Sequence, residues 1–175
     1  MTTSMNGWPA IRFSADPRLR TITIPGTKRS VRVARAAAPL FAAFLADWNR
    51  LMPARLKLNV GPVDGWNYRA SRMSSNLSDH SSGTAVDVRY DILKADSKHH
   101  MTAGETEILK KILAQYVTSD GHHVLANGYV WKSCDEMHTE LSQGWDRGAK
   151  RNTTAADVAQ VIKRLKIDKN GVRPL

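Results

Sequence analysis

The chain has 175 residues, of which 42% are hydrophobic and 24% charged, a composition typical of one folded domain with a hydrophobic core. Its richest apolar run, residues 36–48, contains Pro39 and Asp47 and is shorter than the roughly 18 residues that a membrane-spanning helix needs. The single cysteine, Cys134, excludes an intrachain disulfide, and the N-terminus lacks the pattern of a signal peptide. The sequence therefore predicts a protein without a membrane span that is made and folded in a cytoplasm.

The formal net charge of +10 is unevenly distributed along the chain. Residues 1–72 carry 12 Lys and Arg against 3 acids, residues 73–140 carry 6 against 10, and residues 141–175 carry 8 against 3. All histidines lie in the acidic middle segment: His80, His99, His100, His122, His123 and His138. Basic flanks favour an acidic polymer as partner, and their separation from the histidines favours an enzyme with a docking surface over a pure nucleic-acid binder. Charge that serves only solubility is the alternative.

Taken in chain order, alternating apolar residues predict a hairpin over residues 20–33, with its turn at Pro25-Gly26. Apolar residues at three- and four-residue steps then predict three helices: from near Pro39 to before Pro53, over 102–117 with a Thr102–Glu105 capping box, and over 153–167. Short strands are expected at residues 57–61, 84–90, 128–131 and 137–141. Without a regular βα alternation, this order indicates an α+β fold in one domain, residues 1–175.

The stretch SDHSSGTAVDV, residues 78–88, contains a histidine and an aspartate seven positions apart. A catalytic zinc takes three protein ligands and keeps a fourth position open for water. His80 and Asp87 are candidates for two of these ligands, and the small residues Gly83 and Ala85 keep the backbone between them unencumbered. A polar loop without a metal is the alternative for this stretch taken alone.

The stretch CDEMHTEL, residues 134–141, offers the rest of such a site. His138 is the candidate third ligand. Asp135 is the candidate general base, which takes a proton from an activated water and passes it to the leaving amine. Glu140 lies two residues after His138, so it shares a strand face with it and is expected to hold its imidazole N–H. Glu136 is expected to point the other way.

These two motifs, S-x-H-x-x-G-x-A-x-D and D-x-M-H-x-E in this order, resemble the zinc peptidase superfamily of D-alanyl-D-alanine carboxypeptidases and dipeptidases. The resemblance is closer to its phage branch, the L-alanyl-D-glutamate endopeptidase endolysins, and covers about residues 30–145. Asp135 stands where the carboxypeptidases usually have Glu. The basic helical segment 146–175 lies outside the resemblance, and is expected either to dock on the cell wall or to complete the core.

The resemblance implies a small antiparallel sheet, flanked by helices, that carries one Zn²⁺ per chain on His80, Asp87 and His138, with Asp135 as the base. It also implies an upstream arginine that stabilises the oxyanion or a substrate carboxylate. Arg69 in the segment GWNYRASR fits this position best, and Arg72 is its competitor. Ser78 is expected to shape the first motif or to contact substrate.

Other polar or aromatic residues near the motifs have weaker claims to the site. Trp131 either lines the cleft or belongs to the core. Adjacent histidines on a strand point to opposite faces, so the pairs His99-His100 and His122-His123 are expected at the surface or the cleft edge. Cys134 is expected to be a packed thiol.

The function implied is hydrolysis of the peptidoglycan stem peptide, at the L-alanyl-D-glutamate bond, by a monomeric phage endolysin. The basic flanks would bind anionic wall polymer, with no specific nucleic-acid partner, and a holin-type protein would release the enzyme from the host cytoplasm. A D-alanyl-D-alanine carboxypeptidase or dipeptidase is the alternative within the class. The alternative from another class is a basic polymer-binding module with a structural zinc.

Overall fold

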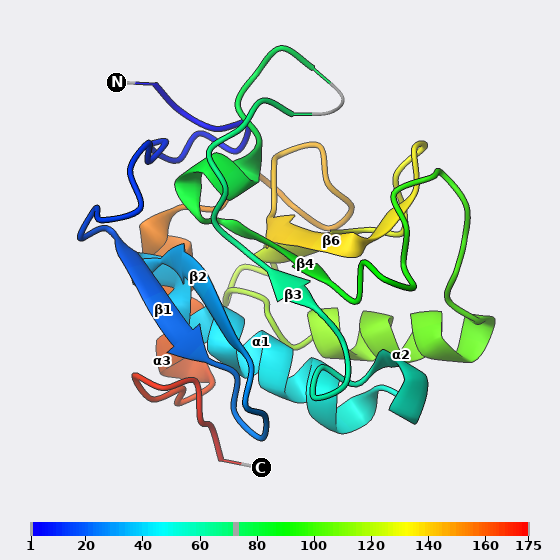
Figure 1. Cartoon of the computed structure of the whole chain (residues 1–175). Coiled ribbons are helices and arrows are strands. Elements are labelled where there is room, and N and C mark those ends of the chain that lie inside the picture. The colour runs from blue at the N-terminus through cyan, green and yellow to red at the C-terminus, as the bar shows by residue number, and fades with distance from the viewer. Residues whose placement is uncertain (1, 72–73, 175) are drawn as a thin grey trace.

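The structure is a computed structural model that describes residues 2–71 and 74–174 (Figure 1). In this part of the chain it has an α+β fold with two antiparallel sheets and three α-helices, as the sequence predicted. The first sheet is a hairpin of β1 (Leu19–Thr23) and β2 (Ser30–Ala34). The second has the order β3-β4-β6-β5 and consists of β3 (Val63–Asp64), β4 (Ala85–Val88), β5 (Leu125–Gly128) and β6 (Asp135–Leu141).

The three α-helices begin where sequence signals place them. Their bounds are α1 (Ala38–Leu51), α2 (Ala103–Leu113) and α3 (Ala155–Arg164). Pro39 occupies the first turn of α1, where its missing N–H costs nothing. Capping boxes begin the other two helices, Thr102 with Glu105 at α2 and Thr154 with Asp157 at α3. Among the described residues, no helix combines the length and apolar character needed to cross a membrane.

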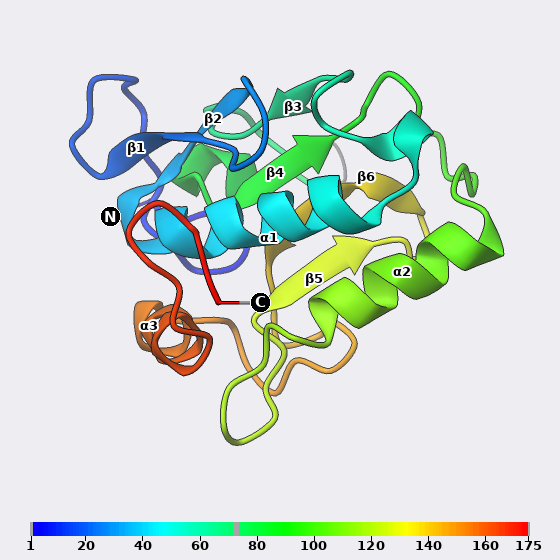
Figure 2. The same ribbon diagram turned by 90° about the horizontal axis from the view of Figure 1, so that it is seen from below.

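The second sheet separates the hydrophobic core from the polar side of the molecule. In Figure 1, α1 and α2 lie below this sheet, whereas the short 3₁₀ helix η3 (Asp79–Ser82) and the loops after β6 lie above it. Side chains alternate accordingly along β4, where Val86 and Val88 join the core below and Asp87 faces the other side. Figure 2 shows α1 crossing beneath the sheet with α2 beside it.

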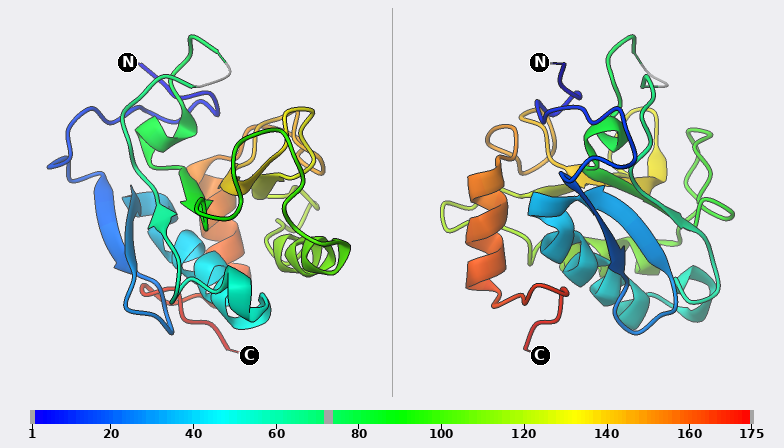
Figure 3. Two further views of the ribbon diagram at one scale, coloured as in Figure 1. Left: turned by 45° about the vertical axis from the view of Figure 1, so that its right-hand side comes forward. Right: turned by 60° about the vertical axis from the view of Figure 1, so that its left-hand side comes forward.

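The core is built around α1. Phe44 of this helix makes edge-on contacts with the rings of Trp48 and Tyr116, each with ring centroids 6.1 Å apart. The hairpin and α3 pack at the sides of the same helix (Figure 3). Together these contacts bury a continuous apolar cluster.

The C-terminal segment completes this core, which is one of the two roles considered for it. Val158, Val161 and Ile167 belong to the buried cluster. Near the end of the chain, an Arg173 Nη2–H donates to Asp47 Oδ2 over 2.6 Å, and the Tyr116 hydroxyl donates to the same oxygen over 2.7 Å. The segment is therefore anchored to α1 by both packing and charge.

The prediction of a strand is wrong at two places. Residues 58–60 form a turn, and the N–H of Leu58 donates to the side-chain oxygen of Asn49 over 2.9 Å. Residues 129–131 also form a turn, in which the N–H of Trp131 donates to the carbonyl of Gly128 over 3.1 Å. The strand in that region is β5, which ends at the turn-forming pair Asn127-Gly128.

Gly83 joins the η3 turn to β4 and has a positive φ of 71°. A Cβ at this position would lie 2.5 Å from the backbone nitrogen of Ala34 on the hairpin. We expect Gly83→Ala to lower the free energy of unfolding by about 2–4 kcal/mol, because it adds left-handed strain to a steric clash. Urea unfolding followed by circular dichroism measures this loss.

Gly104→Ala is the matched control, because no heavy atom lies within 4 Å of a Cβ built at Gly104 and this residue is in α2. It should leave the free energy of unfolding unchanged or raise it by about 0.5 kcal/mol. Equal unfolding midpoints for the two variants would contradict the close approach of the hairpin to Gly83.

Candidate metal centre

The candidate metal centre is assembled from the η3 turn and the two central strands of the second sheet. The side chain of Ser78 accepts the backbone N–H of His80 over 3.4 Å, which caps η3 and sets the start of the turn that carries this histidine. Asp87 on β4 is the direct cross-strand partner of His138 on β6. Side chains of directly paired residues lie on the same face, so the sheet itself brings these two together.

Three donor atoms converge at this point. His138 Nδ1 lies 2.9 Å from Asp87 Oδ1, His80 Nε2 lies 3.1 Å from the same oxygen, and the two ring nitrogens are 3.2 Å apart. Ligands at about 2.0–2.1 Å around a tetrahedral zinc are about 3.3 Å from one another. The three atoms therefore already form one face of a tetrahedron of nearly the size that zinc requires.

The other nitrogen of each imidazole is occupied by an acceptor. His80 Nδ1 lies 2.5 Å from the carbonyl oxygen of Gly65, and His138 Nε2 lies 2.9 Å from Glu140 Oε2. If both rings are neutral and donate these N–H groups, their remaining nitrogens, His80 Nε2 and His138 Nδ1, carry lone pairs that face each other and Asp87. A cation between them relieves the repulsion, and such outer acceptors orient metal-ligating histidines in many proteins.

The electrostatics of the buried group also favour a positive charge. Burial alone would lower the pKa of His138, but Asp87 and Glu140 on either side raise it well above its ordinary value. Burial alone would raise the pKa of Asp87, but contacts with His138 and His80 hold it below its usual range. The residues thus fit a divalent cation, and the site is a buried His/Asp group able to hold a metal ion.

A polar network that sequence reasoning missed extends from Glu140. The Gln143 side-chain amide donates to Glu140 Oε1 over 2.8 Å and to Asp79 Oδ2 over 3.1 Å. Burial and the nearby charge of Glu140 raise the pKa of Asp79 to about 8, so this carboxyl is largely protonated at neutral pH. Asp79 precedes His80 and Gln143 follows Glu140 by three residues, but only the fold shows that they meet.

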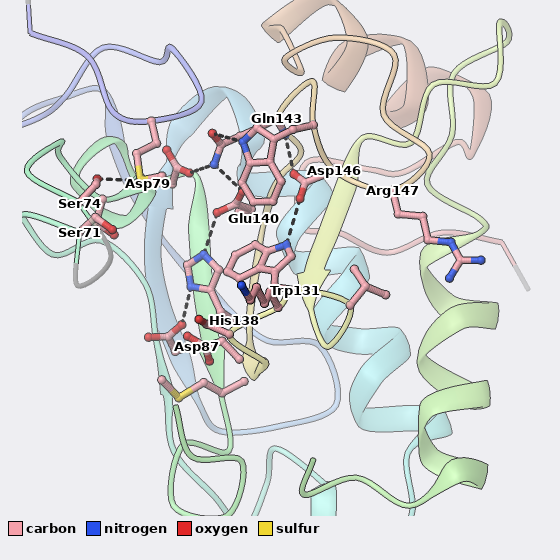
Figure 4. A pocket seen from close by; sticks show the side chains of 18 of the residues that line it. Ser71, Ser74, Asp79, Asp87, Trp131, His138, Glu140, Gln143, Asp146 and Arg147 are labelled. Atoms are coloured by element: carbon pink, nitrogen blue, oxygen red, sulfur yellow. Dashed lines mark hydrogen bonds and ion pairs between the residues drawn. The ribbon is translucent and has the colours of Figure 1, made fainter. Parts of the chain in front are cut away.

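The group opens onto a cleft of about 710 Å³ (Figure 4). The Trp131 ring lies 5.4 Å from the His138 ring and 5.6 Å from that of Trp145, and its Nε1–H donates to Asp146 Oδ1 over 3.1 Å. Among the two roles considered, Trp131 therefore lines the cleft. Basic side chains also line it: Arg69, Lys132 and Arg147.

Most of the sequence-predicted site residues share this cleft. The predicted residues among its lining are Arg69, Ser78, Asp87, Trp131, Asp135, His138 and Glu140. His80 lies behind the lining and is 1% exposed. Arg72, the competitor of Arg69, lies outside the described residues.

Asp135 reaches the cleft because β6 is irregular. Asn127 pairs with Thr139, but the next residue, Gly128, pairs with Asp135, so the register shifts between them. In a regular strand, residues 135 and 138 would face opposite sides, whereas here both line the cleft. Glu136 is turned away and accepts the backbone N–H groups of His100 and Met101.

The remaining histidines separate into surface and core. His99 is exposed, in agreement with a surface position. For His122 the expectation was wrong, because its ring is fully buried and pairs with Thr153 Oγ1 at 2.9 Å and with the N–H of Lys150 at 3.1 Å. These partners satisfy both ring nitrogens, so His122 is a structural residue.

Comparison of the chain with protein-family models, with curated proteins and with solved structures finds no match.

The geometry predicts that the purified chain binds one Zn²⁺ at this group. Inductively coupled plasma mass spectrometry measures the metal content, and isothermal titration calorimetry measures the affinity. Saturation at 100 times the dissociation constant should raise the free energy of unfolding by about 2.7 kcal/mol. Asp87→Asn keeps the shape of the side chain but removes its charge, and should weaken binding by about 10²-fold or more.

Asp16→Asn, in an exposed ion pair with Arg18, is the matched control and should bind zinc as the wild type does. Wild-type affinity in Asp87→Asn would show that zinc binds elsewhere.

Proposed function

We propose that this chain is a zinc metallopeptidase that hydrolyses the stem peptide of peptidoglycan at the L-alanyl-D-glutamate bond. The observation that carries the proposal is the triangle of His80 Nε2, Asp87 Oδ1 and His138 Nδ1, with sides of 2.9–3.2 Å, beside a cleft that Asp135 also lines. The resemblance of both motifs to the phage endopeptidases supports the substrate and the bond. The peptidase fold is part of the same proposal.

His80, Asp87 and His138 would hold the zinc, which supplies a water of lowered pKa and polarises the scissile carbonyl. Asp135 takes a proton from water at its carboxylate and returns it to the leaving amine. Arg69 is among the residues that line the cleft, and its guanidinium would stabilise negative charge on the carbonyl oxygen or bind a substrate carboxylate. Glu140 orients the His138 ring through its Nε2–H.

Both signs of charge line the cleft. The carboxyl side chains are those of Asp79, Asp87, Asp135, Glu140 and Asp146, and the basic ones are those of Arg69, Lys132 and Arg147. In this proposal the three basic side chains bind the carboxylates of the anionic stem peptide. The basic flanks of the chain would bind anionic wall polymer over a larger surface. In this proposal the protein works as a monomer after a holin-type protein releases it from the host cytoplasm.

The bond is tested on purified peptidoglycan, by labelling the new amino ends after digestion. The proposal predicts new D-glutamate amino ends that match new L-alanine carboxyl ends. Release of D-alanine alone would contradict the endopeptidase proposal and support a D-alanyl-D-alanine carboxypeptidase. Tight polymer binding with no cleavage at all would support the binding module with a structural zinc.

Asp135→Asn tests the base. It should lower kcat/KM by about 10²–10⁴-fold while zinc content stays equal to that of the wild type, because Asp135 moves protons and is not among the three donors. The measurement is the rate of stem-peptide hydrolysis together with metal analysis of the same sample. A near wild-type rate would remove Asp135 from the mechanism.

Arg69→Ala and Arg72→Ala, assayed side by side, decide between the two arginines. We expect Arg69→Ala to lower kcat/KM by about 10²–10³-fold, the usual effect of losing one group that stabilises an oxyanion, and Arg69→Lys to recover part of it. Arg72→Ala should have a small effect. The reverse order would assign the role to Arg72.

A further inference from the structure

A second group of potential ligands lies where the loop before α2 meets the beginning of β6. His99 Nδ1 is 3.0 Å from Glu136 Oε1 and 3.4 Å from Cys134 Sγ, and the three donor atoms all lie within 4.8 Å of one another. Around a tetrahedral zinc with Zn–S of about 2.3 Å and Zn–N or Zn–O of about 2.0–2.1 Å, neighbouring ligands are about 3.3–3.6 Å apart. The two distances from His99 Nδ1 are therefore close to the spacing of a metal site, and the cluster is compact enough for one ion to reach all three donors.

Glu136 is held in place by the backbone. Its Oε2 accepts the N–H groups of His100 and Met101, each over 2.7 Å, and its side chain is fully buried. These two bonds fix the carboxylate so that Oε1 points at His99. This is the kind of outer support that orients a ligating carboxylate.

The contacts do not form a catalytic Cys–His–Glu relay. In such a relay the thiol and the carboxylate contact different nitrogens of the imidazole. Here Cys134 Sγ and Glu136 Oε1 both approach Nδ1 of His99, which cannot accept from the thiol and donate to the carboxylate at once. When Nδ1–H donates to Glu136, the thiol donates instead to the carbonyl oxygen of Tyr129 over 3.8 Å, a long contact that a metal–thiolate bond would replace.

Access and protonation also agree with a metal. The His99 side chain is 69% exposed, whereas Cys134 is 4% exposed, so the group is closed on the protein side and open to solvent through the histidine. Burial, with the charges of Glu136 and Asp135, raises the pKa of Cys134 to about 11. Without a metal the thiol is therefore protonated and reacts slowly with alkylating agents, and metal binding would release its proton.

We propose that His99, Cys134 and Glu136 form a second metal site, which takes a thiophilic divalent cation such as Zn²⁺ through one nitrogen, one sulfur and one oxygen donor. Thiolate and imidazole ligands select such ions over Mg²⁺ and Ca²⁺. The site binds more weakly than the first, because its histidine is exposed and its thiol must lose a proton. It ties the loop before α2 to the strand end that carries Asp135, and it does not depend on the proposed peptidase function.

The single cysteine makes this site visible by spectroscopy, because any thiolate-to-metal charge-transfer band must come from Cys134. The test is titration of the reduced, metal-free full chain with Co²⁺, followed in the near ultraviolet and visible. The first equivalent should fill the His80/Asp87/His138 group, which has no sulfur, and give no such band. The second equivalent should produce it.

Variants assign the band to the cluster. Cys134→Ser should abolish it, and His99→Ala should weaken the second binding step by about 10²-fold or more, because loss of even an outer partner costs 10–100-fold. His100→Ala is the matched control and should keep the band, since its ring contacts Asp96 and only its backbone N–H binds Glu136. Asp87→Asn should also keep the band, because it changes only the first site.

Zinc protection of the thiol gives a second readout. Zn²⁺ beyond the first equivalent should slow alkylation of Cys134 in the wild type and in His100→Ala, but not in His99→Ala. Absence of the band at a large excess of Co²⁺, or an unchanged band in His99→Ala, would overturn the proposal. His99 is exposed, so its replacement should leave the fold intact, and near-ultraviolet circular dichroism checks this.

Discussion

Asp87 on β4 and His138 on β6 are directly paired across the central sheet, and the arrangement of the cleft depends on this pairing. A buried carboxylate beside an imidazole is costly unless both find partners. The surroundings supply them: His80 from the η3 turn reaches Asp87, and Glu140, two residues along β6, accepts from His138. A slip of one residue between the strands would turn one side chain into the core and disperse the group.

Close approach of the hairpin holds His80 in this arrangement. The carbonyl of Gly65 accepts from His80 Nδ1. A Cβ added at Gly65 would lie 2.3 Å from the carbonyl oxygen of Arg32 on β2, so only glycine fits at this position. Gly83, which directly follows η3, accepts the N–H of Ala34 on the same hairpin over 2.7 Å. Two glycines thus let the hairpin press against the turn, and this contact links the folding of the N-terminal part to the geometry of the metal centre.

Much of the fold could be predicted from local signals. Proline and capping residues mark where the three helices begin, at Pro39, Thr102 and Thr154. Alternating apolar residues around Pro25-Gly26 mark the hairpin. The short strands could not be placed as well, because β3 has only two residues and β5 ends in a turn pair. For such segments, tertiary hydrogen bonds outweigh local propensity.

Motif spacing predicted four residues of the candidate site: His80, Asp87, His138 and Glu140. Strand pairing brings Asp87 to His138, whereas His80 comes from the η3 turn. Alternation alone would place Asp135 on the wrong face, and only the register shift at Gly128 brings it into the cleft. The meeting of Gln143 with Asp79, and of His99 with Cys134, joins segments more than 30 residues apart. No periodicity within either segment signals such contacts.

The central claim is that His80 Nε2, Asp87 Oδ1 and His138 Nδ1 hold a zinc ion in this cleft. The most direct test is a crystal structure of the zinc-loaded chain with anomalous data collected on both sides of the zinc absorption edge. The account predicts an anomalous peak about 2.0–2.2 Å from these three atoms, with a fourth position that faces the cleft and Asp135. A zinc-loaded crystal with no peak within bonding distance of the three atoms would contradict it.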